Sequence, residues 1–322
     1  MTAAGARVAV LSGGVGAARF LRGLIAAVDD PVTISAVVNT GDDCRLHGLS
    51  ISPDLDTITY TLAGAIDPER GWGLADETWR AIESLARYAA VRPAGSTAAV
   101  SWFNLGDQDL ATHMYRTARL AEGATLTAVT DEIRRAWDVP IGVLPMSDDR
   151  LETRIVTATE GEVAFQEYFV RLRHGVPVEG IRFAGDARLG GASRSALEEA
   201  DVVVVAPSNP LVSIGPIRSL AGVDAALEAR RDSVVAISPI VGGAALKGPA
   251  DRMMNELGHE ASALGVARMY APIAGALVVD PVDAGLRPAI EAEGIRCIVT
   301  PSVMSSPAIA RQLAIATLGA AA

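Results

Sequence analysis

Cysteine, histidine and aromatic residues are scarce in this sequence. Its 322 residues include two cysteines, four histidines and 4% aromatics. Cys44 and Cys297 are far apart and in no metal-binding spacing, so neither a disulfide framework nor a cysteine-based metal site is expected. His47, His174 and His259 fall in no ligand pattern. With no Gly-x-Ser-x-Gly elbow and no cysteine–histidine signature, the sequence favours direct transfer over a covalent intermediate.

The sequence also lacks long hydrophobic runs and an excess of positive charge. Apolar stretches such as 202–206 are short, well below the roughly 18 residues that suggest a membrane span. The formal net charge of −10 disfavours nucleic acid and anionic membranes as partners. Residues 1–7 lack the apolar core of a signal peptide. We therefore expect a cytoplasmic protein that binds neither nucleic acid nor membrane.

What the sequence does contain is an alternation of β-branched segments and amphipathic segments. Residues 8–11 form an apolar strand that runs into a glycine loop, and residues 17–28 have the three-to-four spacing of a helix with one buried face. Residues 32–38 read as a second strand, which completes a βαβ unit. The same rhythm returns later, with further strands expected at 202–206, 234–238, 276–279 and 297–299.

Two segments interrupt this rhythm. Residues 67–150 read as largely helical, and 151–187 as a small β insertion with a hairpin turn at Glu160-Gly161. Residues 1–66 and 188–322 are then expected to form the nucleotide-binding core. The sequence thus predicts an α/β protein with a Rossmann-like, doubly wound and mostly parallel sheet.

The first candidate site is the glycine loop between the first strand and helix. Gly13, Gly14, Val15 and Gly16 place flexible backbone at a helix N-terminus, where N–H groups and the helix dipole favour a phosphate. The loop matches neither the dinucleotide fingerprint nor a Walker motif. A structural tight turn is the alternative.

Two carboxylate pairs follow the next apolar segments. Asp42 and Asp43, preceded by Asn39, come after the second strand, at the edge where doubly wound sheets bind ligands. Asp54 and Asp56 flank Leu55 just beyond. Because Mg²⁺ prefers carboxylates with phosphate oxygens, these residues could hold it beside a diphosphate. The alternative is that some are turn formers or helix caps, Asp54 capping a helix that begins near residue 55.

Three further polar segments are candidate substrate contacts. Asn104 and Asp107 precede a predicted helix at 109–121, although Asp109 could simply be its cap. The loop after the strand at 202–206 contains Pro207, Ser208 and Asn209, and the two polar side chains can recognise a base or phosphate. Lys247, the single lysine of the sequence, could contact a phosphate. Ordinary strand-to-helix turns are the alternative for the last two.

Taken jointly and in this order, the motifs resemble the 2-phospho-L-lactate transferase family of coenzyme F420 biosynthesis, which includes phosphoenolpyruvate transferases. The resemblance runs from near residue 8 to beyond residue 300. It rests on Ser-Gly-Gly-Val-Gly at 12–16, Asn-Thr-Gly-Asp-Asp at 39–43, Ser-Pro-Asp-Leu-Asp at 52–56, Trp-Gly at 72–73, Leu-Gly-Asp at 105–107, Ala-Thr-His at 111–113, Pro-Met-Ser-Asp-Asp at 145–149, Pro-Ser-Asn-Pro at 207–210 and Ser-Pro-Ile at 238–240.

The resemblance implies a Rossmann-like, Mg²⁺-dependent and commonly dimeric transferase. The ribityl hydroxyl of the deazaflavin Fo attacks a phosphate of a GDP-linked three-carbon acid, and GMP leaves. Members differ in the donor, which carries lactate, enolpyruvate or glycerate. Actinobacterial members are thought to use the enolpyruvyl donor and make dehydro-F420-0. The alternative is a non-catalytic regulatory protein of related fold that binds sugar nucleotides.

The resemblance also implies residue roles. Asp56 matches a family position that contacts Fo through the metal. Asp42 or Asp43 matches the other acidic position near the metal. Asn104 stands where archaeal members place a lysine near Fo, and segment 67–150 is expected to line the Fo site. Ser208 and Asn209 fall in the guanine-nucleotide loop, with the glycine loop beside the diphosphate. We take Asp42 and Asp56 as the expected catalytic metal ligands.

Overall fold

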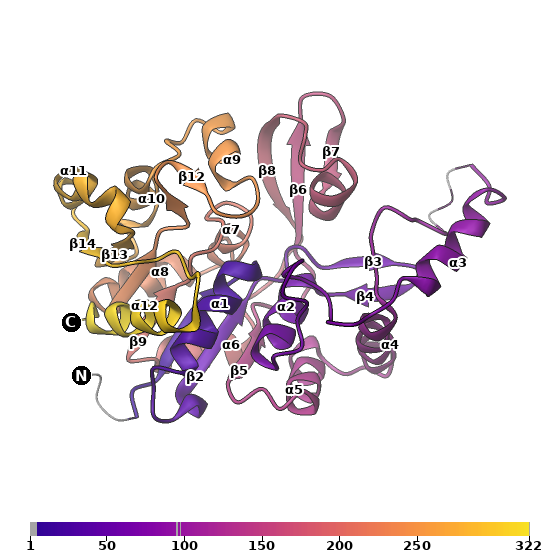
Figure 1. Ribbon diagram of the computed structural model, residues 1–322, viewed down its shortest axis with the longest axis horizontal. Helices are drawn as coiled ribbons and strands as arrows, with labels where there is room; N and C mark the ends of the chain where they lie inside the picture. The colour runs from indigo at the N-terminus through magenta and orange to yellow at the C-terminus, as the bar shows by residue number, and fades with distance from the viewer. Residues whose placement is uncertain (1–4, 95, 97, 322) are drawn as a thin grey trace.

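A seven-stranded sheet organises the computed structural model, which describes residues 5–94, 96 and 98–321. Its strand order is β14-β13-β10-β9-β1-β2-β5, and every neighbouring pair is parallel (Figure 1). The Rossmann-like fold class predicted from the sequence is confirmed. The strands are β1 (Val8–Ser12), β2 (Ile34–Val38), β5 (Gly142–Pro145), β9 (Val202–Val205), β10 (Val234–Ile237), β13 (Ala276–Val279) and β14 (Arg296–Val299).

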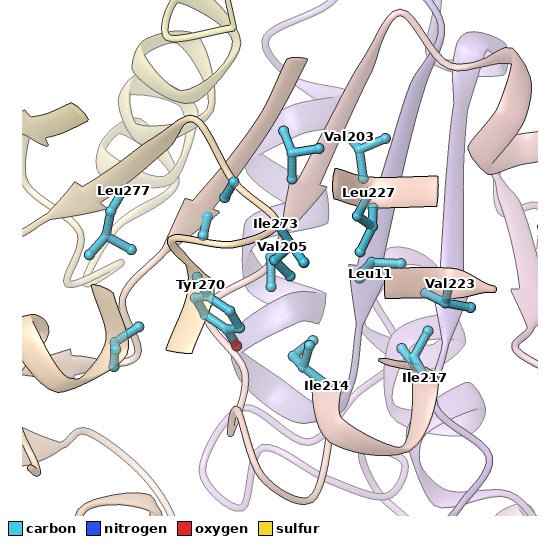
Figure 2. Close-up of a cluster of buried hydrophobic side chains, with 14 of the residues drawn as sticks. Leu11, Val203, Val205, Ile214, Ile217, Val223, Leu227, Tyr270, Ile273 and Leu277 are labelled. Carbon is cyan, nitrogen blue, oxygen red and sulfur yellow. The ribbon is translucent and has the colours of Figure 1, made fainter. Parts of the chain in front are cut away.

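Helices cover both faces of this sheet because successive strand residues point to opposite sides. In β1, Ala9 and Leu11 belong to one buried cluster, whereas Val8 and Val10 belong to the other. Figure 2 shows the first cluster, where Leu11, Val203 and Val205 face helix side chains. That face is covered by α6 (Gly191–Glu199), α7 (Ile214–Arg218), α8 (Val223–Glu228) and α10 (Ala263–Tyr270); the opposite face by α1 (Gly14–Ile25), α2 (Pro53–Leu62), α5 (Leu126–Ala136) and α12 (Pro307–Gly319).

The direction of winding reverses between β1 and β9. The chain leaves β1 through α1 and returns as β2 on one side, whereas β9 pairs with the other side of β1. Ligands of open α/β sheets bind at the carboxyl ends of the strands, where such a reversal separates the connecting loops. The loops that follow β1, β2 and β9 therefore mark the position of the candidate site.

The segment between β2 and β9 departs in part from the expected pattern. The sequence analysis missed strand β5, a short edge strand that ends in proline and pairs only with β2. It also missed a hairpin of β3 (Cys44–Leu46) and β4 (Leu49–Ile51), whose turn residues His47 and Gly48 both have positive φ. The helices of this segment are α3 (Arg80–Ala89), α4 (Asp107–Ala121) and α5.

An antiparallel three-stranded sheet follows β5, in the order β7-β6-β8, and stands beyond the carboxyl edge of the main sheet (Figure 1). The predicted β insertion is thus confirmed; the turn between its first two strands lies at 158–160, so Gly161 begins β7 rather than lying in the turn as expected. A π-helix (Glu167–Arg171) lies between its last two strands. The strands are β6 (Glu152–Thr157), β7 (Gly161–Ala164) and β8 (Val178–Ala184); the C-terminal half adds β11 (Ile240–Val241), β12 (Ala244–Ala245), α9 (Ala250–Glu256) and α11 (Arg287–Ala292).

Two expectations about the whole chain can be compared with these elements. Within the described residues, no helix has both the length and the apolar character needed to cross a bilayer. Cys44 and Cys297 are both free thiols, as the sequence predicted.

Candidate active site

The glycine loop and the Pro-Ser-Asn-Pro loop meet at the reversal point of the sheet. The Gly13 N–H donates to Ser208 Oγ (3.3 Å), and the Ser208 hydroxyl donates to the Gly13 carbonyl (2.7 Å). At Gly16 an added Cβ would lie 2.2 Å from the Pro207 carbonyl oxygen. Backbone contact between the loops therefore requires glycine at position 16, which gives this glycine a packing role.

Replacing Gly16 with alanine is expected to destabilise the protein by about 1–3 kcal/mol, because backbone rather than a flexible side chain must yield. Thermal unfolding of the variant measures this. Gly191, in the first turn of α6, is the matched control because a Cβ there meets nothing within 4 Å. Equal unfolding midpoints for Gly16→Ala and Gly191→Ala would contradict the argument.

Asn39 ties three segments of the site together. Its side-chain oxygen accepts from the Gly41 N–H (2.8 Å), and its amide donates to Asp54 Oδ2 (3.0 Å) and to the Val212 carbonyl (3.4 Å). The side chain is fully buried. In this structure the polar atoms of Asn39 are engaged by protein groups, and the residue fixes the loops after β2 and β9 against α2.

The hairpin between β3 and β4 returns the chain so that the two carboxylate pairs lie together. Ser52 donates its hydroxyl to Asp43 Oδ2 (2.6 Å). Helix α2 begins at Pro53, with Ser52 in the N-cap position, so the alternative that Asp54 caps this helix is wrong. Proline is favoured in the first turn, which moves the start before the aspartate. Asp54 instead faces the glycine loop, where a Cβ on Gly13 would lie 2.9 Å from its Oδ2.

Burial and mutual repulsion give three of these carboxyls unusual proton affinities. Burial, followed by the charge of Asp54, raises the pKa of Asp42 well above its usual value. Burial raises the pKa of Asp43 to about 8 despite the hydrogen bond from Ser52, and that of Asp54 to about 6 despite the one from Asn39. The cluster therefore concentrates more negative charge than its surroundings compensate.

The oxygen atoms of this cluster fit a hard divalent cation. Among the described residues, Asp42 Oδ1 and Asp43 Oδ1 are buried and have no hydrogen-bond partner. Buried polar atoms are rarely left unpaired, and Mg²⁺ is bound through one or two carboxylates together with substrate phosphates and water. The donor chemistry and the two unpaired oxygens thus both suit Mg²⁺.

The raised pKa values predict how metal-free stability depends on pH. Asp43 keeps its proton up to about pH 8 when folded, but only to about 3.8 when unfolded. Between these values the folded state binds more protons, so stability is highest at low pH and falls as pH rises through 8. Asp42 and Asp54 act in the same direction.

In chelator-containing buffer we therefore expect the unfolding midpoint to fall from pH 6 to pH 8.5. Calorimetry or circular dichroism would measure it. Asp43→Asn should flatten the profile, because asparagine does not titrate. A midpoint that rises over this interval in the metal-free protein would show that these carboxyls are ionised at little cost.

Asp56 lies in a buried network with helix α4, close enough to Asp43 for its charge to raise the pKa of that carboxyl. Both of its oxygens accept hydrogen bonds from the guanidinium of Arg116, one of them from Nη1 at 3.1 Å. His113 Nδ1 lies 3.6 Å from Asp56 Oδ2, and His113 Nε2 lies 3.2 Å from Asp109 Oδ2. The Tyr60 hydroxyl donates to Asp109 Oδ1 (2.7 Å).

This network is a second group that could hold an ion. Single ligand atoms of Asp56, Asp109 and His113 lie within 4.8 Å of one another. The Arg116 guanidinium already neutralises Asp56, however, and is only 1% exposed. An imidazole beside an arginine suits Mg²⁺ less well than the oxygen cluster of Asp42 and Asp43.

Arg116 was not predicted from the sequence, and a helix cap was the alternative for Asp109. That alternative is wrong, because α4 begins at Asp107 with Gly106 in the cap position, and Asp109 is the third helical residue. The detectable signal was the spacing of Asp109, His113 and Arg116, which places three polar residues on one helical face. The hairpin holds this face towards Asp56: the Ser50 N–H donates to Thr117 Oγ1 (2.8 Å).

The remaining predicted residues lie in different environments. Asn104 is exposed on the loop before α4. Asp107 accepts from the Thr78 N–H (2.7 Å) and hydroxyl (2.9 Å), so it anchors that loop. Asn209 Oδ1 accepts from the N–H groups of the second and third residues after it, which shapes its own turn. Lys247 is exposed, and its Nζ approaches Gly71.

Comparison with known proteins identifies the family of this chain. The sequence profile described as 2-phospho-L-lactate transferase CofD matches residues 8–293. A phosphoenolpyruvate transferase of Streptomyces griseus is 44% identical over 316 residues, covering 95% of this chain and 96% of that protein. One from Mycobacterium avium is 39% identical over 339 residues, covering 97% and 98%.

A solved structure supports the same fold. A crystal structure of a UPF0052 family protein from Bacillus halodurans covers 97% of this chain and 98% of its own, with a TM-score of 0.60 and 16% identity. At that identity the likeness concerns the fold alone. The profile match and the extent of the curated relatives carry the assignment: this chain belongs to the 2-phospho-L-lactate transferase CofD family.

Proposed function

We propose that the protein transfers a phosphate-linked three-carbon acid from a GDP-activated donor to the ribityl hydroxyl of the deazaflavin Fo, in coenzyme F420 biosynthesis. The observation that carries this proposal is the buried carboxylate cluster, with two unpaired oxygens, beside the loops that meet at the sheet's reversal point. Phosphoryl transfer depends on positioning and charge neutralisation, which such a cluster with a bound Mg²⁺ provides.

Enolpyruvate is the donor acid that we favour. The curated relatives that cover nearly all of this chain are named phosphoenolpyruvate transferases. The product would then be dehydro-F420-0, with GMP released. Lactate or glycerate donors are the alternatives within the family.

Asp42 and Asp56, one from each carboxylate pair, are the proposed metal ligands. Bound Mg²⁺ would neutralise the donor diphosphate and the charge that develops on the transferred phosphate. In the transfer step the Fo hydroxyl oxygen forms a bond to that phosphorus, and the bond from phosphorus to the GMP oxygen breaks. The hydroxyl proton goes to a carboxylate of the site, which is Asp42 or Asp56 if that residue does not hold the ion.

The glycine loop is proposed to bind the diphosphate through the start of α1. Gly13 already donates to Ser208, so this contact would use the N–H groups of Val15 and Gly16. Such groups in the first turn have no acceptor within the helix. Lys247 Nζ and the Val15 side chain both lie near Gly71, so this lysine could neutralise a phosphate held by the loop. Ser208 and Asn209 shape the neighbouring loop, and Asn104 and Asp107 lie on the proposed Fo side.

Product masses test the proposal directly. The protein would be incubated with Fo, Mg²⁺ and each GDP-linked donor separately. A product lighter than F420-0 by two hydrogens indicates enolpyruvate, F420-0 itself indicates lactate, and a product heavier by one oxygen indicates glycerate. No product from any donor, with guanine nucleotide still bound, would refute transfer and favour a non-catalytic nucleotide-binding protein.

A further inference from the structure

The β insertion carries an aromatic surface to which none of these roles assigns a function. Phe165 and Phe169 stack with ring centroids 5.5 Å apart and planes at 22°. Phe169 also lies 5.3 Å from the ring of His174, at 33°. Phe165 is buried, whereas Phe169 is 36% exposed. One outer ring is therefore supported from behind and partly open to solvent.

The backbone that presents this surface is irregular. Phe169 lies in a π-helix, a rare conformation that is frequent at functional sites. Arg173 and His174 follow with φ of 50° and 41°, in the left-handed region that side chains disfavour. Strain of this kind persists only where the surroundings enforce it. Here the His174 N–H donates to the Tyr168 carbonyl (2.9 Å), which holds the imidazole beside Phe169.

Three observations place the aromatic surface near the candidate active site. Gln166, in the turn before Phe169, donates its amide to the carbonyl of Asp42 (3.4 Å). A Cβ on Gly248 would lie 4.0 Å from Phe169 Cε2, so the ring borders the loop that carries Lys247. A Cβ on Gly71 would meet Lys247 Nζ at 2.8 Å and Val15 Cγ1 at 3.8 Å. Phe169 thus borders the loop of Lys247, the chain's single lysine, and Gly71 lies near both this lysine and Val15 of the glycine loop.

The contacts behind the surface lead to the donor side of the site. Phe165 belongs to a buried cluster with Val212 and Met253. Val212 lies in the loop after β9, and Met253 contacts the Asn209 amide. The acidic groups proposed to face the acceptor lie on α2 and α4 instead.

We infer that Phe169, supported by Phe165 and His174, is the surface on which the purine ring of the nucleotide donor stacks. This inference rests on the proposed function and adds the place of the base to it. A phenyl face that borders a lysine and leads to a phosphate-binding loop matches the chemistry of a nucleotide, whose planar base is joined to anionic groups. Stacking would supply affinity and leave the choice between purines to other contacts.

Binding of GMP and of Fo by calorimetry tests the inference on four proteins. Phe169→Ala is expected to weaken GMP binding by about tenfold or more and to leave Fo binding unchanged. Phe169→Trp should restore it, and quenching of the introduced tryptophan by GMP would report the stacking itself. Val32→Ala is the control, because Val32 is an exposed apolar residue just before β2 and outside segment 67–150.

The outcomes separate this inference from the proposed function. Unchanged GMP affinity in Phe169→Ala, weakened Fo binding with unchanged GMP binding, or a wild-type protein that does not bind GMP would each overturn it. GMP binding that depends on Phe169 in a protein without transfer activity would support the stacking surface and refute the transferase proposal. If the wild type forms product and Phe169→Ala binds GMP as tightly as the wild type, the transferase proposal is supported and the stacking surface is refuted.

Discussion

Replacement of Asp56 with asparagine is expected to lower turnover by roughly a thousandfold while the protein stays folded. Asparagine keeps the size of the side chain and one oxygen that can accept from Arg116. It removes the negative charge through which Asp56 would bind Mg²⁺ and stabilise charge in the transfer step. A metal ion contributes several kcal/mol to such a step, and each 1.4 kcal/mol corresponds to a factor of ten.

Turnover measured over a range of Mg²⁺ concentrations distinguishes a metal ligand from a structural residue. Loss of a ligand should raise the Mg²⁺ concentration needed for half-maximal rate, whereas misfolding lowers the amount of active protein without that shift. Asp30→Asn is the matched control, because Asp30 is exposed at the opposite end of β2. Near-normal turnover of Asp56→Asn at every Mg²⁺ concentration would refute the catalytic role.

Two further variants locate the metal. If Mg²⁺ binds the oxygen cluster, Asp42→Asn should raise the Mg²⁺ requirement and Asp109→Asn should not. If the ion instead occupies the group of Asp56, Asp109 and His113, the pattern reverses. The choice matters because an ion in the second group would share Asp56 with the Arg116 guanidinium.

The sheet could be predicted because its strands are buried on both faces. Stretches such as 202–205 are uniformly β-branched and end at glycine or proline, so their period and limits are visible in the sequence. Strand β5 has the sequence Gly-Val-Leu-Pro, which contains fewer β-branched residues, and it pairs on one side only. It was therefore not predicted. Helix α1 was expected at 17–28 but begins at Gly14, because the glycine loop itself forms its first turn.

The candidate site was predictable in its location but not in its contacts. Strand ends indicated that Asp42 and the glycine loop would lie at one edge of the sheet. No local pattern could show that the Asn39 side chain forms hydrogen bonds with three protein groups. Nor could it show that Asp56 and Arg116, far apart in sequence, form an ion pair. Such pairs depend on the hairpin after β2, which was not predicted from the sequence.

Replacing Arg116 with methionine is expected to destabilise the protein by about 3–5 kcal/mol, because it leaves Asp56 buried without its partner. Burial alone would lower the pKa of the Arg116 guanidinium, yet Asp56 raises it above its usual value. The charge of each residue thus depends on the other. Chemical or thermal unfolding of the variant in chelator-containing buffer measures the loss.

The double variant Asp56→Asn/Arg116→Met separates the pair from its surroundings. Removing both charges should recover a large part of the stability lost in Arg116→Met, since replacing a whole buried pair costs far less than breaking it. Arg116→Lys keeps the charge but not the paired donors, and should fall between wild type and Arg116→Met. If the double variant is as unstable as the sum of the single ones, Arg116 acts through packing in α4. Recovery would show that the arginine is present to compensate Asp56, and that any cation bound beside it must share a carboxylate already neutralised by the protein.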